Sequence, residues 1–303
     1  MKYFILIICY LTLSFSNDFD YKLKAIKLSE NSYYFYGKEE YFSKENGGDI
    51  ANASFIITAN SVILIDTGSS KSYGEQVKKQ IEKITSKPIK YIINTHHHPD
   101  HFLGNSAFFS SDIYATEFTK EDIEKNGHLY IANLRNLIKD AINGTKIKAP
   151  DKILQSKTLD LDGYKLKVLY LDGHTQSDIA IYDENTKILY ASDLVFYKRT
   201  PATPHANIQN WIKSLEELEK IDYSVLIPGH GLTSKTKEPI KENVAYLNYL
   251  DSTLKSSVKE GLDVFEILEK AIPKEFESFT MFKEEFERSV INLYPSYEKD
   301  LKK

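Results

Sequence analysis

The chain has 303 residues, of which 42% are hydrophobic and 27% are charged, and its formal net charge is −4. This length is enough for one large globular domain or two modest ones. The sequence has no basic stripe and no polybasic run, which argues against binding to a nucleic-acid backbone.

The first residues predict a secretory signal peptide over residues 1–16. An apolar run over Tyr3–Phe15 is too short for a comfortable membrane span, and Ser14 and Ser16 precede the expected cut. A signal anchor is the alternative. Cleavage would also remove Cys9, so that the mature chain would hold neither disulfides nor cysteine metal ligands. We therefore expect a periplasmic or secreted protein with no stable membrane span after cleavage.

The first half of the chain alternates strand-like and helical segments. A polar loop over Glu39–Asn52 is long for a hairpin and has the character of a flap or substrate loop. The spacing of apolar residues predicts a helix over Ser72–Thr85. Strands are expected at Leu23–Leu28, Ser32–Tyr36, Phe55–Thr58, Val62–Ile65, Lys90–Ile93 and Asp112–Ala115.

The second half continues with strands and ends in helices. A charged helical segment over 116–143 is expected to break at Asn126-Gly127, because glycine is a poor helix former. Residues 235–303 contain no convincing strand and predict two or three amphipathic helices. Between them we expect strand-like Lys157–Tyr170 with a turn at Asp162-Gly163, a hairpin of Ile179–Tyr182 and Ile188–Ala191, a helix over Ile208–Lys220 and a strand at Val225–Ile227.

The densest chemical signal is the stretch Asn-Thr-His-His-His-Pro-Asp-His over residues 94–101, directly after an apolar strand. It holds His96, His98, Asp100 and His101, although histidine makes up only 8 of 303 residues. Imidazole nitrogens with a carboxylate oxygen are ligands that suit zinc and its neighbours. The stretch therefore predicts a metal site, with His97 facing away from it because neighbours in extended chain face opposite ways.

Further candidate ligands each lie within a few residues of the end of another strand-like run: Asp66, His174, Asp193 and His230. Strands of a layered α/β protein deliver their following loops to one edge of the sheet, so these segments can meet. The combined set suffices for two metal ions, and a shared carboxylate could hold them about 3.5–4 Å apart.

The ordered motifs strongly resemble those of the metallo-β-lactamase superfamily. The resemblance covers roughly residues 30–231 and implies an α/β fold, the four-layer αββα sandwich, over 17–234, with 235–303 as a C-terminal helical extension packed on the same domain. The motifs are Asp66-Thr67-Gly68, His96-x-His98-x-Asp100-His101, Gly173-His174-Thr175, Asp193 and Pro228-Gly229-His230-Gly231.

The same resemblance implies the ligand set. His96, His98 and His174 would hold one metal, Asp100, His101 and His230 the second, and Asp193 would bridge them. Two Zn²⁺ are expected, with iron or manganese as the alternatives. Asp100 would also transfer protons as the catalytic residue. Residues expected to orient the imidazoles are Asp66, Thr67 and Thr175, and residues expected at the substrate rim are His128 and His205.

A narrower similarity concerns Glu45–Asn52, Asp193 and the helical tail, which look like the periplasmic quinoprotein-relay zinc hydrolases and the related sulfur-oxidation group. It implies periplasmic redox or sulfur-metabolism partners. Where this chain has Asp193, the antibiotic-hydrolysing branches place a cysteine or a small residue. Thioesterase, lactonase and phosphodiesterase branches carry Asp there.

We therefore expect a secreted dinuclear zinc hydrolase that uses a metal-bridging hydroxide on an ester, thioester, lactone or amide carbonyl of a small molecule. The alternatives are a β-lactamase, a mononuclear iron oxygenase of the same fold, and a non-catalytic periplasmic partner in a redox relay.

Overall fold

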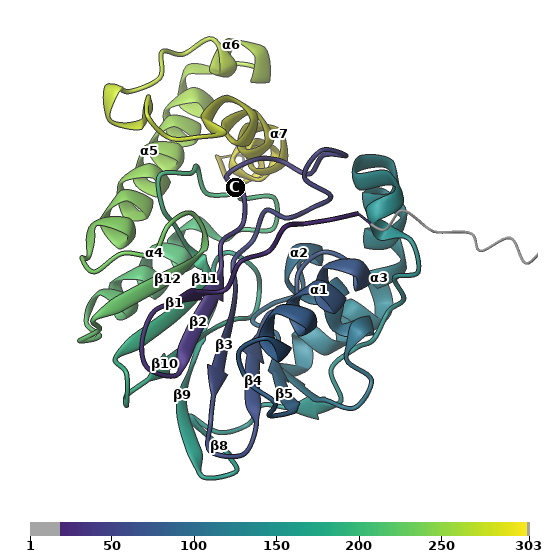
Figure 1. Cartoon of the computed structure of the whole chain (residues 1–303). Coiled ribbons are helices and arrows are strands. Elements are labelled where there is room, and N and C mark those ends of the chain that lie inside the picture. Colours follow the sequence, from purple (N-terminus) through teal and green to yellow (C-terminus); the bar gives the residue numbers. More distant parts are fainter. Residues whose placement is uncertain (1–18, 302–303) are drawn as a thin grey trace, which may run out of the picture.

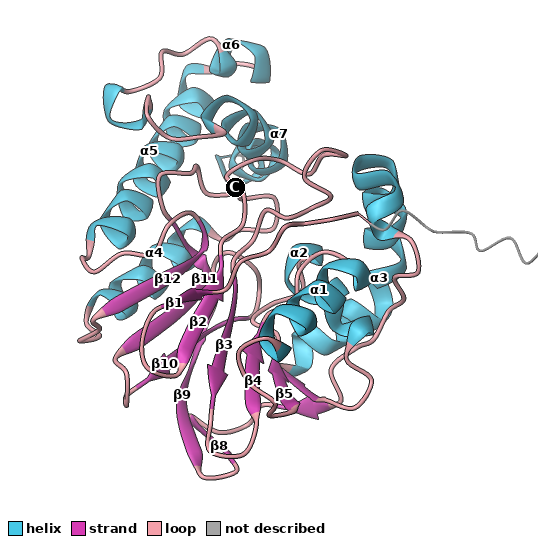
Figure 2. Ribbon diagram, in the orientation of Figure 1, coloured by secondary structure: helices cyan, strands magenta, loops and turns pink. Residues whose placement is uncertain are grey.

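Two β-sheets lie face to face, and helices cover the outer face of each sheet (Figure 1, Figure 2). The computed structural model describes residues 19–301, so the predicted signal peptide and Cys9 lie outside this part of the chain. The predicted α/β class, a four-layer αββα sandwich with C-terminal helices, is confirmed.

The first sheet has seven strands in the order β1-β2-β3-β4-β5-β6-β7. Neighbours from β1 to β4 are antiparallel, and those from β4 to β7 are parallel. A parallel pair needs a crossover, and helix α1 (Lys71–Glu82) supplies it between β4 and β5. The strands are β1 Ile26–Lys27, β2 Ser32–Phe35, β3 Ala53–Ile57, β4 Val62–Ile65, β5 Ile89–Ile93, β6 Asp112–Ala115 and β7 Lys152–Ile153.

The second sheet has five strands in the order β12-β11-β10-β9-β8. All its neighbours are antiparallel except β11 and β12, which are parallel and joined through helix α4 (Ile208–Glu219). The strands are β8 Thr158–Leu161, β9 Tyr164–Leu171, β10 Asp178–Asp183, β11 Ile188–Phe196 and β12 Val225–His230.

Alternation of side chains along β4 explains why the sheets stack. Ile63 and Ile65 belong to the buried cluster between the sheets, where Ile179 and Ile181 of β10 also lie. Val62 and Leu64 belong to a second cluster, with the apolar face of α1. Because successive side chains of a strand face opposite ways, a strand that is apolar throughout packs on both faces.

Helix α3 (Glu117–Ile138) runs without interruption through Gly127, so the predicted break at Asn126-Gly127 is wrong. A Cβ at position 127 would lie 2.7 Å from Cδ1 of Ile147. The glycine therefore serves close packing inside the helix. A short 3-10 segment, η2 (Lys139–Ile142), ends the helical region.

The tail forms α5 (Glu238–Glu260), α6 (Val264–Leu268), η3 (Lys274–Phe276) and α7 (Phe282–Leu301). Leu250 of α5 and Phe286 of α7 share one hydrophobic cluster with Trp211 of α4 and Leu189 of β11. The tail helices thus cover the second sheet and lie beside the edge where β11 and β12 end (Figure 1). Among the described residues, no helix is both long enough and apolar enough to cross a membrane.

Candidate metal centre

The first group of predicted donors surrounds the short helix α2 (Pro99–Phe102), which follows β5. The chain stays extended through His98, which has φ −71° and ψ 146°. Pro99 starts the helix, because a proline ring fixes φ near the helical value and has no N–H to leave unpaired. The turn brings the ring of His101 to a centroid distance of 4.3 Å from the ring of His96. A 3-10 segment, η1 (Leu103–Ala107), follows.

The second group comes from the other sheet. His174 lies in the loop between β9 and β10, and Gly173 before it has φ +127°. A Cβ on Gly173 would lie 2.2 Å from Cα of Trp211. Only glycine therefore lets this loop approach α4 so closely.

Asp193 and His230 lie inside strands β11 and β12, rather than after them as the sequence predicted. The pairing of these strands shifts register at Ser192, whose φ is +47°. A bulge of this kind bends a strand and redirects its side chains. The irregularity prolongs β11 past its regular pairing and leaves the Asp193 carboxylate 3.3 Å from Nε2 of His230.

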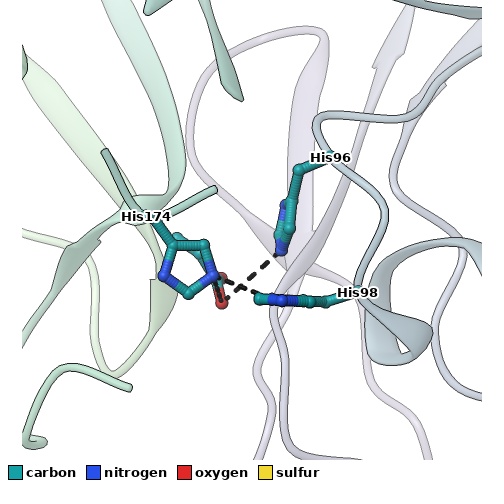
Figure 3. A group of neighbouring side chains, drawn as sticks. His96, His98 and His174 are labelled. Carbon is teal, nitrogen blue, oxygen red and sulfur yellow. Dashed lines mark hydrogen bonds and ion pairs between the residues drawn. The ribbon is translucent and has the colours of Figure 1, made fainter. Parts of the chain in front are cut away.

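The donors gather into two sets that share one carboxylate. Donor atoms of His96, His98, His174 and Asp193 lie within 4.8 Å of one another, as do those of Asp100, His101 and His230. Figure 3 shows the rings of the first three histidines directed toward one another.

Asp193 reaches both sets. Its Oδ1 lies 3.0 Å from Nε2 of His101, and its Oδ2 lies 3.4 Å from Nε2 of His174. Asp100 is placed beside the second set, with Oδ2 3.5 Å from Nε2 of His230. The structure therefore brings together every residue that the sequence predicted as a metal ligand.

Buried polar atoms in this cluster test whether the residues fit a metal. Nε2 of His96 is buried without a hydrogen-bond partner within residues 19–301, and the buried Nε2 of His101 and Oδ1 of Asp193 have no partner there other than each other, at 3.0 Å. A buried polar atom without a partner is costly, and native proteins rarely keep one. Coordination to a cation would satisfy all three, so the donor set fits two metal ions.

Asp66 orients His101 from behind. It follows β4, has φ +59°, and its Oδ2 accepts a hydrogen bond of 2.8 Å from Nδ1 of His101. The carboxylate also accepts bonds from the backbone N and the hydroxyl of Thr95, at 2.9 and 2.8 Å. With its proton held on Nδ1, the His101 ring presents Nε2 to the site.

Backbone carbonyls orient two more rings. Nδ1 of His230 donates to the carbonyl of Ile50 at 2.7 Å, and Nδ1 of His174 donates to the carbonyl of Ala202 at 3.1 Å. Both rings therefore offer Nε2 to the site.

His98 is held through its other ring nitrogen, Nε2. Its Nδ1 lies 2.9 Å from Nε2 of His174 inside the cluster, and its Nε2 lies 2.9 Å from Nδ1 of His205. With Nδ1 turned to the site, Nε2 carries the proton and donates to His205. His97 is buried beside these rings and packs edge-on against Phe118, and its donor atom lies within 4.8 Å of donor atoms of His98 and His205.

Burial keeps the first set of imidazoles neutral. It lowers the pKa of His174 to about 3 and lowers the pKa of His96 and His98 well below the usual value. Burial alone would raise the pKa of Asp193, but electrostatic attraction to His101 and His230 and hydrogen bonds from them outweigh it and hold that pKa well below its usual value. Burial alone would lower the pKa of His101, but Asp193, Asp100 and Asp66 raise it well above its usual value, so a cation bound there would displace a proton from this ring. Neutral imidazole and ionised carboxylate are the forms that bind metal.

Gly229 gives the shared carboxylate its room. A Cβ at this position would lie 1.9 Å from Oδ1 of Asp193 and 2.7 Å from its backbone N. Asn52 fixes the same turn, because its Nδ2 donates to the carbonyls of Pro228 and Gly231, each at 2.8 Å. Gly229, the first glycine of the Pro-Gly-His-Gly motif, thus leaves room for the carboxylate of Asp193 in the neighbouring strand.

A pocket of about 240 Å³ opens onto the donors. His98, Asp100, Asp193 and His230 form part of its lining, and the tail contributes Glu285 and Arg288. The remaining lining residues are Tyr41, Phe42, Ile50, Pro99, Tyr130, Asn133, Arg199, Ala202, Pro204 and His205.

Not every residue singled out in the sequence lies where it was expected. Thr67 donates to Asn105 at 2.9 Å, and Thr175 donates to Asp178 at 2.7 Å, so neither hydroxyl touches an imidazole. His205 lines the pocket, as predicted for the rim, whereas His128 is an exposed residue of α3 outside that lining.

Other residues of the site escaped sequence analysis. Asn52 carries no motif of its own. The buried ion pair between Arg199 and Glu285 joins residues 86 positions apart, which no local pattern reveals.

Comparisons with known proteins agree on one family. Residues 46–230 match the model of the metallo-beta-lactamase superfamily. A linear primary-alkylsulfatase from Pseudomonas sp. is 24% identical over 288 residues, covering 78% of this chain and 53% of the relative. A probable metallo-hydrolase from Methanocaldococcus jannaschii is 27% identical over 196 residues, covering 62% of this chain and 91% of the relative.

Among solved structures, a metallo-beta-lactamase from Pontibacter korlensis superimposes with a TM-score of 0.62 at 21% identity and covers 75% of this chain and 99% of that one. Likeness at this identity speaks for the fold alone. This chain spans about half the length of the alkylsulfatase. The fold assembles histidines and aspartates into groups that could hold metal ions, and because the family match covers more than half of the chain, the protein belongs to the metallo-β-lactamase superfamily.

Proposed function

We propose that the protein is a dinuclear zinc hydrolase that cleaves an ester, thioester, lactone or amide bond of a small molecule. The observation that carries this proposal is the position of Asp193, whose carboxylate lies beside both donor sets, 3.4 Å from Nε2 of His174 and 3.0 Å from Nε2 of His101. One cation would be held by His96, His98 and His174, the other by Asp100, His101 and His230, with Asp193 between them.

Bound cations would supply a hydroxide nucleophile at neutral pH and polarise the scissile carbonyl. The protein's own residues prepare that chemistry. Asp66 keeps the proton of His101 on Nδ1, and the Ile50 carbonyl does the same for His230, so both rings face the site with Nε2. Asp100 lines the pocket beside His230 and is placed to take a proton and return it to the leaving group.

A sulfate ester is a second candidate for the bond that is cleaved. The relative that aligns with 78% of this chain is described as a linear primary-alkylsulfatase. The arginines of the pocket, Arg199 and Arg288, also favour an anionic substrate.

We also propose that the metal is zinc, that the protein is periplasmic, and that it is a member of the sulfur-oxidation group of hydrolases. The chemistry of the donors supports zinc, since imidazole with carboxylate is a common zinc set. The signal-like sequence of the first 16 residues supports export.

Metal analysis of protein purified without added metal tests the site. We expect about two zinc ions per chain in the wild type, and a large loss of metal in Asp193→Ala and in His98→Ala. His128→Ala, which removes an exposed histidine of α3, is the control and should keep the wild-type content. Unchanged metal content in both site variants would refute the assignment.

A hydrolysis screen separates the functions. Turnover of aryl esters, thioesters or lactones by the zinc form supports the proposal, and turnover of an alkyl sulfate supports the second candidate. Rapid turnover of nitrocefin would favour a β-lactamase. One iron per chain would favour an oxygenase, and bound metal without turnover of any substrate would favour a non-catalytic partner.

A further inference from the structure

Arg199, Glu285 and Arg288, here called the arginine cluster, line the same pocket as the metal donors. We propose that this cluster binds an oxyanion on the substrate, such as a carboxylate at a distance from the scissile bond, and that Arg288 makes the main contact. The inference rests on the proposed hydrolase function and adds a charge requirement for its substrate.

The charges of the cluster do not balance. Glu285 is 1% exposed, and its two oxygens serve two guanidinium groups: Nη2 of Arg199 at 3.3 Å and Nη1 of Arg288 at 2.8 Å. Two positive charges against one negative charge leave an excess of one positive charge beside the pocket. An anion on the substrate would compensate it.

Donor groups are also left over. Arg199 is 2% exposed, and its Nε has no hydrogen-bond partner within the described part of the chain. The side chain of Arg288 makes one hydrogen bond there and is 34% exposed, so its remaining N–H groups are open to solvent and accessible to a ligand. A cluster with a buried orphan donor and unused N–H groups is suited to a ligand with several acceptor oxygens.

Holding the tail in place does not explain Arg288. The Arg199–Glu285 pair already joins α7 to the loop after β11, and the backbone of Thr280 pairs with Lys198 and Thr200 beside it. Arg288 and Glu285 belong to one helix, three positions apart, so their ion pair joins no separate elements. The contact of Arg288 with another element is with Tyr41, which also lines the pocket, so Arg288 is the member of the cluster that serves the pocket.

The loop Glu39–Asn52, which was predicted to be a flap, contacts Arg288. Its guanidinium carbon lies 5.1 Å from the centroid of the Tyr41 ring, a cation–π contact between α7 and the loop after β2. Tyr41, Phe42 and Ile50 add apolar side chains to the lining of the pocket, which also holds the guanidinium and the donors. Within about 240 Å³ this arrangement suits a small organic acid that carries its reactive bond on a short apolar spacer.

Two aryl esters with the same leaving group test the proposal. 4-Nitrophenyl butanoate is neutral, whereas the mono-4-nitrophenyl ester of glutaric acid ends in a carboxylate. In Arg288→Ala we expect kcat/KM for the anionic ester to fall about ten- to a hundredfold, as for a lost hydrogen bond to a charged group, and kcat/KM for the neutral ester to change by less than about twofold. Arg288→Lys, which keeps the charge, should recover part of the preference.

Arg135→Ala is the matched control, since Arg135 is an exposed residue of α3 outside the pocket lining. It should leave both esters unaffected. Equal losses on the two esters in Arg288→Ala would show that the residue supports the fold alone and would overturn the proposal, as would no loss on either.

A binding measurement keeps the two proposals distinguishable if the wild type cleaves neither ester. Thermal unfolding of the zinc-loaded protein is followed with glutarate, which has two carboxylates, and with pentanoate, which has one. The additional rise in Tm with glutarate should disappear in Arg288→Ala. Should that difference persist in the variant, the oxyanion site is refuted whatever the enzyme hydrolyses.

Discussion

The histidines of the metal centre are held by the ring nitrogen that faces away from it. Asp66 holds His101 through Nδ1, and His205 holds His98 through Nε2. Such partners fix the tautomer and the angle of the ring, and their loss commonly weakens metal binding.

His205 is accordingly a positioning residue for His98. His205→Ala removes the acceptor at 2.9 Å from Nε2 of His98, so that the ring can rotate and lose its alignment toward the site. We expect the zinc dissociation constant to rise about ten- to a hundredfold. Competition with a chelator of known affinity measures this without any substrate.

Two further variants interpret that result. His205→Gln retains an acceptor and should restore part of the affinity, whereas His128→Ala removes an exposed histidine of α3 and should have no effect. Wild-type affinity in His205→Ala would mean that His98 is oriented without this partner.

Sequence analysis found the donors but only part of what orients them. Histidines and aspartates are rare enough in combination to mark the site, and Asp66 belongs to a motif. The acceptors of His174 and His230 are the carbonyls of Ala202 and Ile50. Every residue has a backbone carbonyl, so the residue type does not indicate which carbonyl accepts a hydrogen bond from a histidine.

Among the elements, the segment between β2 and β3 places a carboxylate where burial disfavours its charge. Asp49 is 5% exposed, and burial raises its pKa from 3.8 to about 7, an effect that nearby Lys38 opposes and Glu40 reinforces. The folded state therefore holds a proton on Asp49 more tightly than the unfolded state does. The resulting stability is complete below about pH 4 and is lost as the pH rises through 7.

Asp49→Asn tests this sign, because the amide is neutral at every pH. The difference in unfolding free energy between the variant and the wild type should change in favour of the variant by on the order of 2 kcal/mol as the pH rises from 5 to 8. Urea unfolding at both pH values measures the difference, and metal contributions cancel because both proteins carry the same ligands.

Asp140→Asn, at an exposed position of η2, is the control and should shift stability by at most about 0.5 kcal/mol at either pH. A constant difference between Asp49→Asn and the wild type at the two pH values would contradict the raised pKa of Asp49.

Most elements follow from local pattern, and the exceptions have tertiary causes. Strand β6 has the predicted bounds, and α4 ends one residue earlier than predicted. Strand β11 runs on to Phe196, because a bulge at Ser192 keeps it beside β12. Helix α3 passes through Gly127, and the glycine is needed there because Ile147 occupies the space that a side chain would need. Neither β12 nor Ile147 is close enough in sequence for a local pattern to reveal these contacts.

At the scale of the whole molecule, the tail and the sandwich share one hydrophobic cluster. Leu250 and Leu254 of α5 are fully buried together with Leu215 and Leu218 of α4. Because side chains are buried together across the boundary at residue 235, we expect the tail to unfold together with the sandwich. The sequence predicted the helices of the tail and their packing beside the site, but not which residues of α7, Glu285 and Arg288, line the pocket.

Leu250→Ala tests the shared core. The substitution should lower the free energy of unfolding by about 2–5 kcal/mol and shift one cooperative transition of the entire chain, observed by calorimetry. Leu129→Ala, at a side chain that is 56% exposed, should have little effect. A separate early transition for the tail alone would show that it is an independent domain.

The division of the donors between the two sheets links metal supply to the lifetime of the protein. His96, Asp100 and His101 follow the first sheet, and His174, Asp193 and His230 belong to the second. Cations bound by both groups of donors would link the two sheets, and their free energy of binding would add to the free energy of folding. A cell short of metal would then lose the protein to proteolysis as well as its activity, so the abundance of this chain would itself follow the available metal.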